Sequence, residues 1–432
     1  MDNKIFKLAL PNIITNITIP ILGVIDIAIA GRLGSSLYIG AIALGANIFN
    51  MLYWNFGFLR MSTSGFASQA YGARNLAESM NTLLRSLIIG LCIGLLIIIL
   101  QYPIGQLALS FIKSGAESVE QVGYYFNIVV WGAPAVLGMY ALKGWFIGMQ
   151  NAKTPMIIAI LNNVLNIILS MIFVFLFDMK ISGIALGTCL SQIISFIVAV
   201  FLWFRYYGRM TKYIRKDKIW NNHVIKEYFK VNSDIFIRTF LLTLVTTFFT
   251  FASSGMGETV LAVNALLMQF FVLFSYFMDG FAYAAEALTG RYVGSENDYL
   301  LKLMIRRVFF WGLMVTAFTV LIYILFPDLI LRVLTNETFI IDEAKNFIVW
   351  IVLIPIVGFA AFLWDGIFIG ATASVEMRNA MIISTAVFFI SYFLLYPIFG
   401  NNGLWLSFIL YLAFRGISLT FMARKIFKYE KV

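Results

Sequence analysis

The sequence predicts an all-α integral membrane protein, with twelve transmembrane helices in two pseudo-symmetric six-helix bundles. Three observations support this fold class. Hydrophobic residues make up 61% of the 432 residues and charged residues only 12%, about half the charged share of soluble domains. The hydrophobic residues form runs of about 20 residues, the length that a helix needs to cross a bilayer core. A motif of the first half recurs in the second half, which indicates a duplication.

The apolar runs place six spans in each half of the chain. They are continuous rather than alternating, which excludes a transmembrane β-barrel. The predicted spans of the first half are 8–30, 39–59, 87–109, 124–147, 156–177 and 184–204. Those of the second half are 235–252, 260–278, 308–326, 347–369, 380–398 and 404–422.

The repeated motif fixes the internal symmetry. The segment Gly144–Gly148 recurs 222 positions later as Gly366–Gly370. Because six spans is an even number, the two copies enter the membrane in the same direction and form parallel repeats. We expect an N-lobe over 1–204, a basic cytoplasmic linker over 205–230 and a C-lobe over 231–432. Further pairs keep nearly the same offset: Gly72 with Gly294, Asn75 with Asn297, Gly34 with Gly257, and Gly183 with Gly403.

The positions of Lys and Arg predict the topology. Placing both termini in the cytoplasm puts 23 of the 31 Lys and Arg residues on the cytoplasmic side, as the positive-inside rule requires. We therefore expect a multi-pass protein of the cytoplasmic (inner) membrane. The net charge of +10 then reflects topology and implies no nucleic-acid partner. No loop is long enough to fold as a soluble catalytic domain.

Few polar residues fall inside the spans, and Asp26 is the first. It lies in the outer third of the first span, six residues after Pro20. Burial favours the neutral form of a carboxyl group, and a proline permits a bend in its helix. The combination suits a proton-driven gate. Alternatively, Asp26 lies near enough to the outer surface to extend to it or to pair with Arg32.

A second polar group comes from the fifth and sixth spans. Asn166 and Ser170 are one turn apart on one helical face, and Thr188 lies near the start of the next span. These side chains either line a polar chamber with Asp26 or form the hydrogen bonds between helices that are common in membrane bundles.

Four runs of the sequence are distinctive in combination: 24–34 with Asp26, 58–61 with Arg60, 279–288, and 365–372. Together they resemble the multidrug and toxic compound extrusion (MATE) family, most closely its DinF-like branch. The resemblance implies a secondary exporter of drugs or metabolites with two six-helix lobes in a V around a central cleft. It implies a proton or sodium gradient as the driving force, and no other cofactor. The likeness extends over nearly the whole chain, of which these four runs are the most specific parts.

The family's N-lobe site matches Asp26, Asn166 and Thr188 of this chain. Many relatives carry a second acid where this chain has Ser170. Since a hard cation prefers several oxygen ligands with carboxylates among them, this departure weakens the expectation of a tight sodium site. A single acid is enough for a proton.

Internal alignment carries this polar group onto aromatic residues of the C-lobe. Asp26 falls on Phe248 or Phe249, and the other three positions fall on aromatic residues as well. We infer that the N-lobe holds a protonatable chamber and that the C-lobe offers aromatic surface to the substrate. Because 42 residues are Phe, coincidence is the alternative. The other three pairs are Asn166 with Phe388, Ser170 with Tyr392, and Thr188 with Phe408.

Other charged residues inside or beside the spans are candidates for coupling or for ion pairs. Lys143 aligns with Asp365, so the two copies carry opposite charges at equivalent positions. Asp365 is either a second coupling acid or half of an ion pair. Asp279 and Glu286, seven residues apart on one helical face, either pair with Arg60 or line the inner mouth. Asp234 and Arg238 are spaced for a local i, i+4 pair.

The predicted function is export of small cationic or amphipathic molecules by a monomer in the lipid bilayer, and not enzymatic catalysis. A flippase for lipid-linked precursors is the first alternative, but it would need a more strongly charged cavity. An intramembrane enzyme is the second, but the chain has one histidine, His223, in a basic loop. No phosphate-binding loop is present, so direct use of ATP is not expected.

Overall fold

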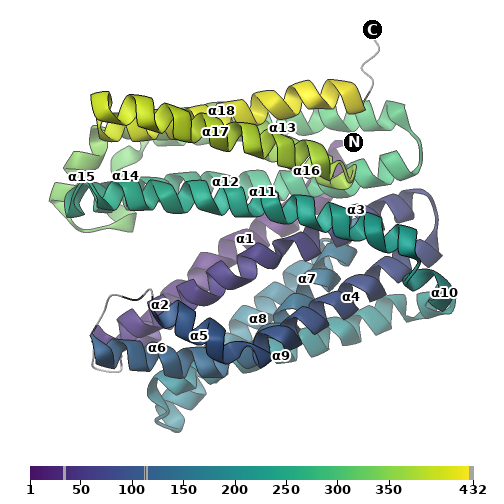
Figure 1. The fold of residues 1–432 in the computed structure, drawn as a ribbon, viewed down its shortest axis with the longest axis horizontal. Helices are drawn as coiled ribbons and strands as arrows, with labels where there is room; N and C mark the ends of the chain where they lie inside the picture. The colour runs from purple at the N-terminus through teal and green to yellow at the C-terminus, as the bar shows by residue number, and fades with distance from the viewer. Residues whose placement is uncertain (33–35, 111, 113–114, 428–432) are drawn as a thin grey trace. The chain divides into compact units, whose positions relative to one another are not determined.

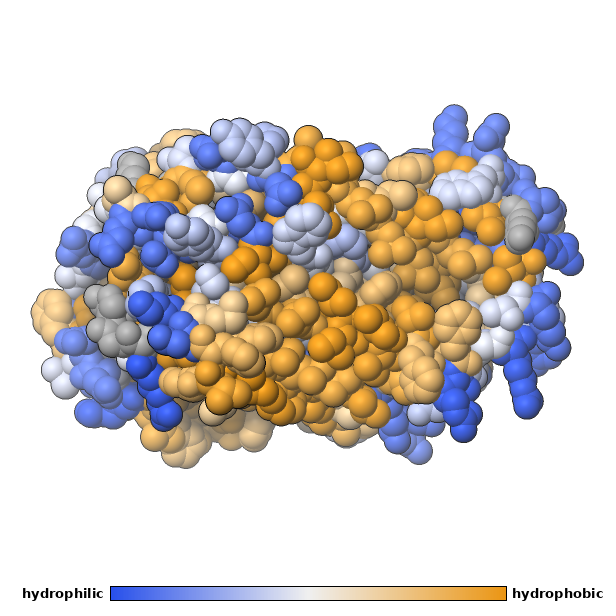
Figure 2. Space-filling view, turned by 90° about the horizontal axis from the view of Figure 1, so that it is seen from below, coloured by the Kyte–Doolittle hydropathy of each residue, from blue (hydrophilic) through white to orange (hydrophobic). Residues whose placement is uncertain are grey.

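The computed structural model describes residues 1–32, 36–110, 112 and 115–427, which are almost entirely helical (Figure 1). Twelve helical stretches in this part of the chain are long and apolar enough to cross a membrane, which confirms the predicted number. Figure 2 shows hydrophobic side chains gathered over the middle of the visible face and hydrophilic ones at its two ends. That banding is the pattern of a protein that lies across a bilayer.

The first half supplies spans one to six. The second and fourth spans each contain a short 3₁₀ turn, at Asn55–Gly57 and Val130–Gly132. The fifth ends in a π-helix at Ile172–Leu176. The helices are α1 (Asp2–Gly31), α2 (Ser36–Trp54), α3 (Phe58–Gly72), α4 (Leu76–Ile99), α5 (Gln101–Ser110), α6 (Ala116–Val129), α7 (Ala133–Gly148), α8 (Lys153–Met171) and α9 (Lys180–Tyr207).

The second half supplies spans seven to twelve, after a 3₁₀ turn at Gly208–Tyr213 and the short helix α10 (Lys216–Ile219). Helices α16, α17 and α18 pack against one another (Figure 1). The helices are α11 (Asn222–Ser254), α12 (Glu258–Gly294), α13 (Asp298–Leu325), α14 (Pro327–Leu334), α15 (Thr338–Lys345), α16 (Ile348–Gly370), α17 (Ser374–Phe399) and α18 (Asn401–Ile426).

The third span differs from its predicted range of 87–109. The helix α4 begins at Leu76 and ends at Ile99, and the separate helix α5 covers the rest. Asn75 sets the start, because its side chain accepts a hydrogen bond from the backbone N–H of Glu78 at 3.1 Å. The first turns of α4 bury several polar side chains beside Met80 and Leu83, so hydropathy alone places the helix too late.

The chain folds as two compact units, which we call the N-unit (residues 10–227) and the C-unit (residues 1–9 and 228–432). The first nine residues, placed in the N-lobe from sequence, pack instead with the second half. The Phe6 ring lies 4.6 Å from the ring of Trp311, and the indole N–H of Trp311 donates to Asp2 at 3.1 Å. The helix α1 therefore begins in one unit and continues into the other.

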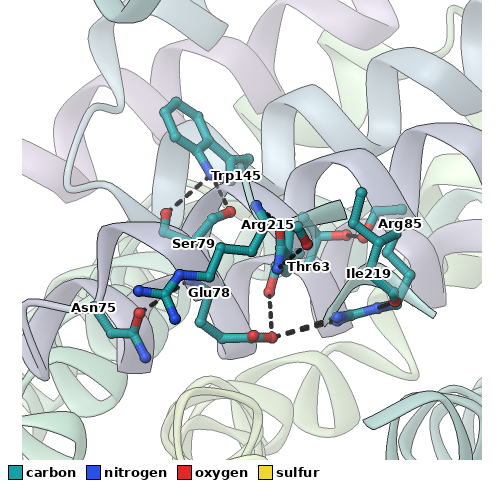
Figure 3. A network of polar contacts seen from close by, with 11 residues as sticks. Thr63, Asn75, Glu78, Ser79, Arg85, Trp145, Arg215 and Ile219 are labelled. Carbon is teal, nitrogen blue, oxygen red and sulfur yellow. Dashed lines mark hydrogen bonds and ion pairs between the residues drawn. The ribbon is translucent and has the colours of Figure 1, made fainter. Parts of the chain in front are cut away.

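Much of the predicted linker packs within the N-unit, where polar side chains of α4 hold its backbone (Figure 3). The Asn81 side chain exchanges two hydrogen bonds of 3.3 Å with the backbone of Arg215. The buried Arg85 donates from Nε to the carbonyl oxygen of Ile219 at 3.1 Å and forms an ion pair with Glu78 at 3.4 Å. These contacts join residues 215–219 to the N-unit.

The glycines of the repeated motif are sites of close helix packing. A Cβ atom on Gly144 would collide with the carbonyl oxygen of Arg60, and one on Gly366 with that of Ala282. Arg60 and Ala282 are themselves 222 residues apart. The same offset therefore relates both partners of the contact, α7 on α3 in the N-unit and α16 on α12 in the C-unit.

The turns that follow these helices are repeated as well. Arg74 and Glu296 adopt left-handed backbone conformations, with φ values of 56° and 52°, and each precedes an asparagine that caps the next helix. Gln150 and Thr372 form a second such pair, with φ values of 62° and 54°. The structure therefore repeats the turns at the predicted offset. Gly34, the partner of Gly257, lies outside the described residues.

Candidate functional site

Asn166, Ser170 and Thr188 lie together where α8 packs on α9 in the N-unit. The Asn166 amide donates from Nδ2 to Oγ1 of Thr188 at 3.0 Å. Asn166 and Ser170 are fully buried. Gly187 permits this close packing, because a Cβ atom there would lie 2.7 Å from the backbone nitrogen of Ser170. The polar residues predicted from two different spans therefore form one contact.

Asp26 joins this group through a tyrosine on α6. The carboxyl group lies half-buried on α1, and its Oδ1 atom is buried without a hydrogen-bond partner. The buried side chain of Tyr125 lies within electrostatic range of Asp26 and hydrogen-bonds to Thr188. Among the described residues no ion pair joins Asp26 to Arg32, which is exposed. The alternative of a surface pair with Arg32 is therefore wrong.

The helix that carries Asp26 is held to α8 next to a proline. Pro11 and Pro20 both lie inside α1, and Pro20 cannot donate the backbone hydrogen bond that other helix residues make. Two residues before it, the carbonyl oxygen of Thr18 accepts a hydrogen bond from the Asn163 amide at 3.1 Å. Asn163 is thus a positioning residue, which ties α1 to the helix that bears Asn166.

Several buried oxygen atoms around this site have no hydrogen-bond partner. Most buried polar atoms are paired, and an unpaired one is costly. A carboxylate oxygen and an amide oxygen can only accept hydrogen bonds, so the group lacks donors or a cation. In the described part of the chain these atoms are Asp26 Oδ1, Asn166 Oδ1, Ser170 Oγ, Gln192 Oε1 and the Tyr53 hydroxyl.

The tyrosines and the glutamine were not found by sequence reasoning. Tyr53 on α2 interacts electrostatically with Tyr125, Tyr140 and Cys189, and Gln192 follows Cys189 by one helical turn on α9. The sequence holds 20 tyrosines, and tyrosine is common at membrane interfaces. No local sequence pattern distinguishes Tyr53 and Tyr125, which reach the site, from the other tyrosines.

The site contains one carboxylate. A search of the described residues finds no group of three or more His, Cys, Asp or Glu side chains that could hold a metal ion. Asp26 is the only formal charge among the residues joined above, and its neighbours are an amide and hydroxyl groups. Such a set can carry a proton, whereas a sodium ion would have a single charged ligand.

Arg60 and Lys143 lie near each other within the N-unit. Their helices α3 and α7 touch at the contact between Gly144 and the Arg60 carbonyl, and the Lys143 ammonium lies within electrostatic range of the Arg60 guanidinium. Both side chains are half-buried. The N-unit thus has a lysine, with an arginine beside it, at the position where the C-unit has the acid Asp365.

That acid, Asp365, is paired within the C-unit. Arg238 of α11 and Arg415 of α18 both donate to its Oδ2 atom. The local pair expected between Asp234 and Arg238 is wrong. Asp234 instead accepts from Arg378 at 2.6 Å and from a serine hydroxyl at 2.8 Å. Both residues find partners on other helices, which sequence spacing does not reveal.

The two acids of α12 have different surroundings. Glu286 has no accessible surface, and its backbone carbonyl lies at the close contact with Gly370. Asp279 is half-buried and lies within electrostatic range of Arg415. Neither Asp279 nor Glu286 is without an interaction partner. Asp279 therefore contributes negative charge near the arginine pair.

The four aromatic residues predicted in the C-lobe form one connected cluster. The Phe248 ring lies 5.0 Å from that of Tyr392 and 6.0 Å from that of Phe388. The Phe408 ring lies 5.4 Å from that of Phe249 and stacks on that of Tyr411 at 6.0 Å, and the Tyr411 ring lies 6.3 Å from that of Phe388. Phe388 and Phe408 have no accessible surface, whereas Phe248 and Tyr392 are half-buried. Only the last two offer surface in this conformation.

Comparisons with known proteins add to this geometry. A sequence model of the MatE family matches twice, over residues 11–172 and 235–398. The chain is 35% identical to DNA damage-inducible protein F of Escherichia coli (strain K12), over 98% of this chain and 92% of the relative. It is 24% identical to the multidrug export protein MepA of Staphylococcus aureus (strain NCTC 8325 / PS 47), over 62% of this chain and 56% of the relative.

Solved structures share the fold over nearly all of both chains. The crystal structure of MATE in the bent conformation matches with a TM-score of 0.88 and 20% identity, and covers 99% of this chain and 95% of the other. An outward-facing multidrug resistance MATE family transporter of the MOP superfamily matches with a TM-score of 0.86 and 20% identity, and covers 99% and 96%.

Proposed function

This chain belongs to the MatE family of membrane transporters, and on that premise we propose that it exports small molecules in exchange for protons, with Asp26 as the coupling residue. The observation that carries the proposal is a set of buried acceptor atoms on α1, α8 and α9 that have no hydrogen-bond partner, Asp26 Oδ1 among them. Asp26 Oδ1, Asn166 Oδ1 and Gln192 Oε1 all lack a donor. A proton supplies one, because a protonated carboxyl group gains an O–H that can donate.

Protonation would also change the helix that carries the acid. Ionised Asp26 is costly in a partly desolvated site, so it favours a conformation that leaves the carboxylate hydrated. The neutral acid can enter the polar group of α8 and α9. Because α1 lacks a backbone hydrogen bond at Pro20, a bend there can accompany the change. The proton thus binds one conformation better than the other, which coupling requires.

Sodium is the alternative coupling ion. It could use the Asp26 carboxylate together with the oxygen atoms of Asn166 and Ser170. The single formal charge in this set disfavours it, because hard cations in proteins are commonly held by more than one carboxylate. We therefore propose the proton as the principal ion.

The cargo is proposed to be a small amphipathic molecule; relatives are named as a multidrug export protein and a multidrug resistance transporter. Phe248 and Tyr392, the half-buried members of the aromatic cluster, are the proposed contacts for an apolar or aromatic part of the cargo. We further propose that the protein works as a monomer in the cytoplasmic membrane, with both termini in the cytoplasm.

The test is export by purified protein in liposomes under separately imposed proton and sodium gradients. Wild-type protein should export a fluorescent multidrug substrate under the proton gradient alone. Asp26→Asn keeps the size of the side chain but removes its titration, and should reduce this export to the level of empty liposomes. Asp328→Asn, which removes an exposed acid of α14, is the matched control and should export normally. Proton-driven export by Asp26→Asn would refute the proposal.

A further inference from the structure

Two arginines and one aspartate form a buried triad inside the C-unit. Arg238 on α11 and Arg415 on α18 both bind the same oxygen, Oδ2, of Asp365 on α16. The arginine side chains are 6% and 4% exposed, and the Asp365 side chain is 11% exposed. The triad is therefore shielded from solvent but is still reached by it through Asp365.

The triad has more positive charge than its own acid neutralises. Two guanidinium groups share one carboxylate, and the electrostatic effect of Asp279 on Arg415 is smaller than that of Asp365. In addition, the Nε atoms of both arginines are buried without a hydrogen-bond partner. Buried charges are normally paired and buried donors are normally bonded. The triad therefore has the charge and the free donors to bind a further anionic group.

Arginine is suited to this role. Its planar guanidinium carries five N–H donors and binds carboxylate or phosphate oxygens in pairs. The half-buried ion pair between Arg378 and Asp234 in the C-unit differs from the triad in its charge balance. There a single arginine, Arg378, meets a single acid, Asp234, which also accepts a hydrogen bond from Ser374. The pair of Arg378 and Asp234 is balanced in charge, whereas the triad is not.

Aromatic rings lie beside the triad. The Arg415 guanidinium lies 5.7 Å from the centre of the Phe362 ring. The Phe362 ring in turn lies 6.2 Å from that of Phe271. Tyr411, which hydrogen-bonds to Arg415, stacks on Phe408 at 6.0 Å. The positive charge is therefore bordered by the same aromatic cluster that contains Phe248 and Tyr392.

We propose that this triad binds the anionic group of an amphipathic aromatic molecule, with the carboxylate or phosphate on Arg238 and Arg415 and the apolar body against the neighbouring rings. The inference rests on the proposed transport function in that this molecule would be its cargo. It departs from the expectation of a cationic substrate, because the C-unit arginines would repel a cation.

Asp365 has a defined part in this proposal. Its carboxylate occupies the arginines when no ligand is bound and must be displaced, at least in part, when an anion arrives. Asp365 therefore competes with the ligand. Removing its charge should strengthen anion binding, whereas removing an arginine should weaken it. A triad that serves only to hold three helices together would not give changes of opposite sign.

The experiment measures equilibrium binding by calorimetry to purified full-length protein in an uncharged detergent, without any gradient. The probes are naphthalene-2-carboxylate, its uncharged carboxamide and the cation 2-naphthylmethylammonium. Wild-type protein should bind the carboxylate at least about tenfold more tightly than the carboxamide, since a charge-assisted hydrogen bond contributes about 1.5–3 kcal/mol. The cation should bind most weakly.

Three variants test whether removing an arginine and removing the acid change the affinity for the anion in opposite directions. Arg415→Gln should weaken carboxylate binding about tenfold or more and leave carboxamide binding nearly unchanged. Asp365→Asn should strengthen carboxylate binding. Arg378→Gln, which breaks the half-buried pair with Asp234, is the matched control and should leave the preference for the anion unchanged. If Arg415→Gln does not fold, Arg415→Lys keeps the charge without the fork and should bind the carboxylate with intermediate affinity.

Equal binding of the three probes by wild-type protein would overturn the proposal, and so would weaker carboxylate binding in Asp365→Asn. Nanodiscs of phosphatidylcholine with and without phosphatidylglycerol distinguish two sources of the anion. Competition by phosphatidylglycerol would support a lipid headgroup as occupant of the arginines, and its absence would support a free molecule. Because binding is measured without a gradient, its failure leaves the proton coupling of Asp26 standing, and the reverse also holds.

Discussion

The N-unit and the C-unit share a backbone plan but differ in the chemistry of their interiors. Both use a glycine pair to bring two helices together at equivalent positions, and both use the same left-handed turns and asparagine caps. At the positions where the N-unit has Asp26, Asn166 and Thr188, the C-unit has aromatic residues. The duplicated framework was thus retained while the side chains inside it diverged.

Charge diverged in the same way. Lys143 lies beside Arg60 in the N-unit, whereas the equivalent residue of the C-unit, Asp365, lies between Arg238 and Arg415. The N-unit contains a lone acid among unsatisfied acceptors, and the C-unit contains unsatisfied arginine donors beside aromatic rings. This difference is the basis of our proposal that one unit serves the coupling ion and the other the cargo.

The shared framework predicts that equivalent glycines are equally sensitive. Gly144→Ala and Gly366→Ala each place a Cβ atom against a backbone carbonyl, which no side-chain rotation can relieve. Each should lower stability by roughly 3 kcal/mol, visible as a loss of folded protein by size-exclusion chromatography and thermal melting. Gly40→Ala, at a helical position with open space around the Cβ, is the control. Tolerance of either motif substitution would break the equivalence of the units.

Asp26, the one acid of the polar site in the N-unit, can be given a partner. Ser170→Asp adds a second carboxylate beside Asn166 and Thr188, which should create a site for a hard cation. We expect sodium binding to tighten by about tenfold or more and export to become sensitive to a sodium gradient. Ser195→Asp, a buried serine one turn beyond Ser191 on α9, is the control for a new buried acid. Sodium dependence in both variants would mean that the position does not matter.

The aromatic cluster should separate structure from selectivity. Phe248→Ala removes a half-buried ring and should change the relative export of different substrates by a few fold, with proton coupling unchanged. Phe388→Ala empties a fully buried site and should destabilise the protein by about 3–5 kcal/mol. Phe318→Ala, on an exposed ring of α13, should do neither. Identical substrate profiles for Phe248→Ala and wild-type protein would remove the cluster from the cargo site.

The sequence predicted the spans because each is a long apolar run, and it predicted the repeat because close-packed glycines keep their spacing. It also predicted correctly that Asn166 and Thr188 lie together, since their spans are consecutive. Burial of polar residues explains where it failed. Asn81 and Arg85 are each 1% exposed, so the start of α4 reads as a loop although it is packed and hydrogen-bonded.

Partners from distant parts of the chain were beyond the reach of sequence spacing. Asp234 and Arg238 are one helical turn apart but bind Arg378 and Asp365 instead. Tyr125 reaches Thr188 from another span, and Phe6 packs on Trp311 although the two residues lie at opposite ends of the sequence. These contacts depend on how helices pack, which a local pattern does not contain.

The central claim is that Asp26 carries the exchanged proton. The most direct measurement records pH inside liposomes that contain the protein and an entrapped pH-sensitive dye, after substrate is added on one side without an imposed gradient. In wild-type protein, substrate movement should drive protons in the opposite direction, and Asp26→Asn should show no proton movement with the same substrate. Substrate-driven proton movement that persists in Asp26→Asn would contradict the account.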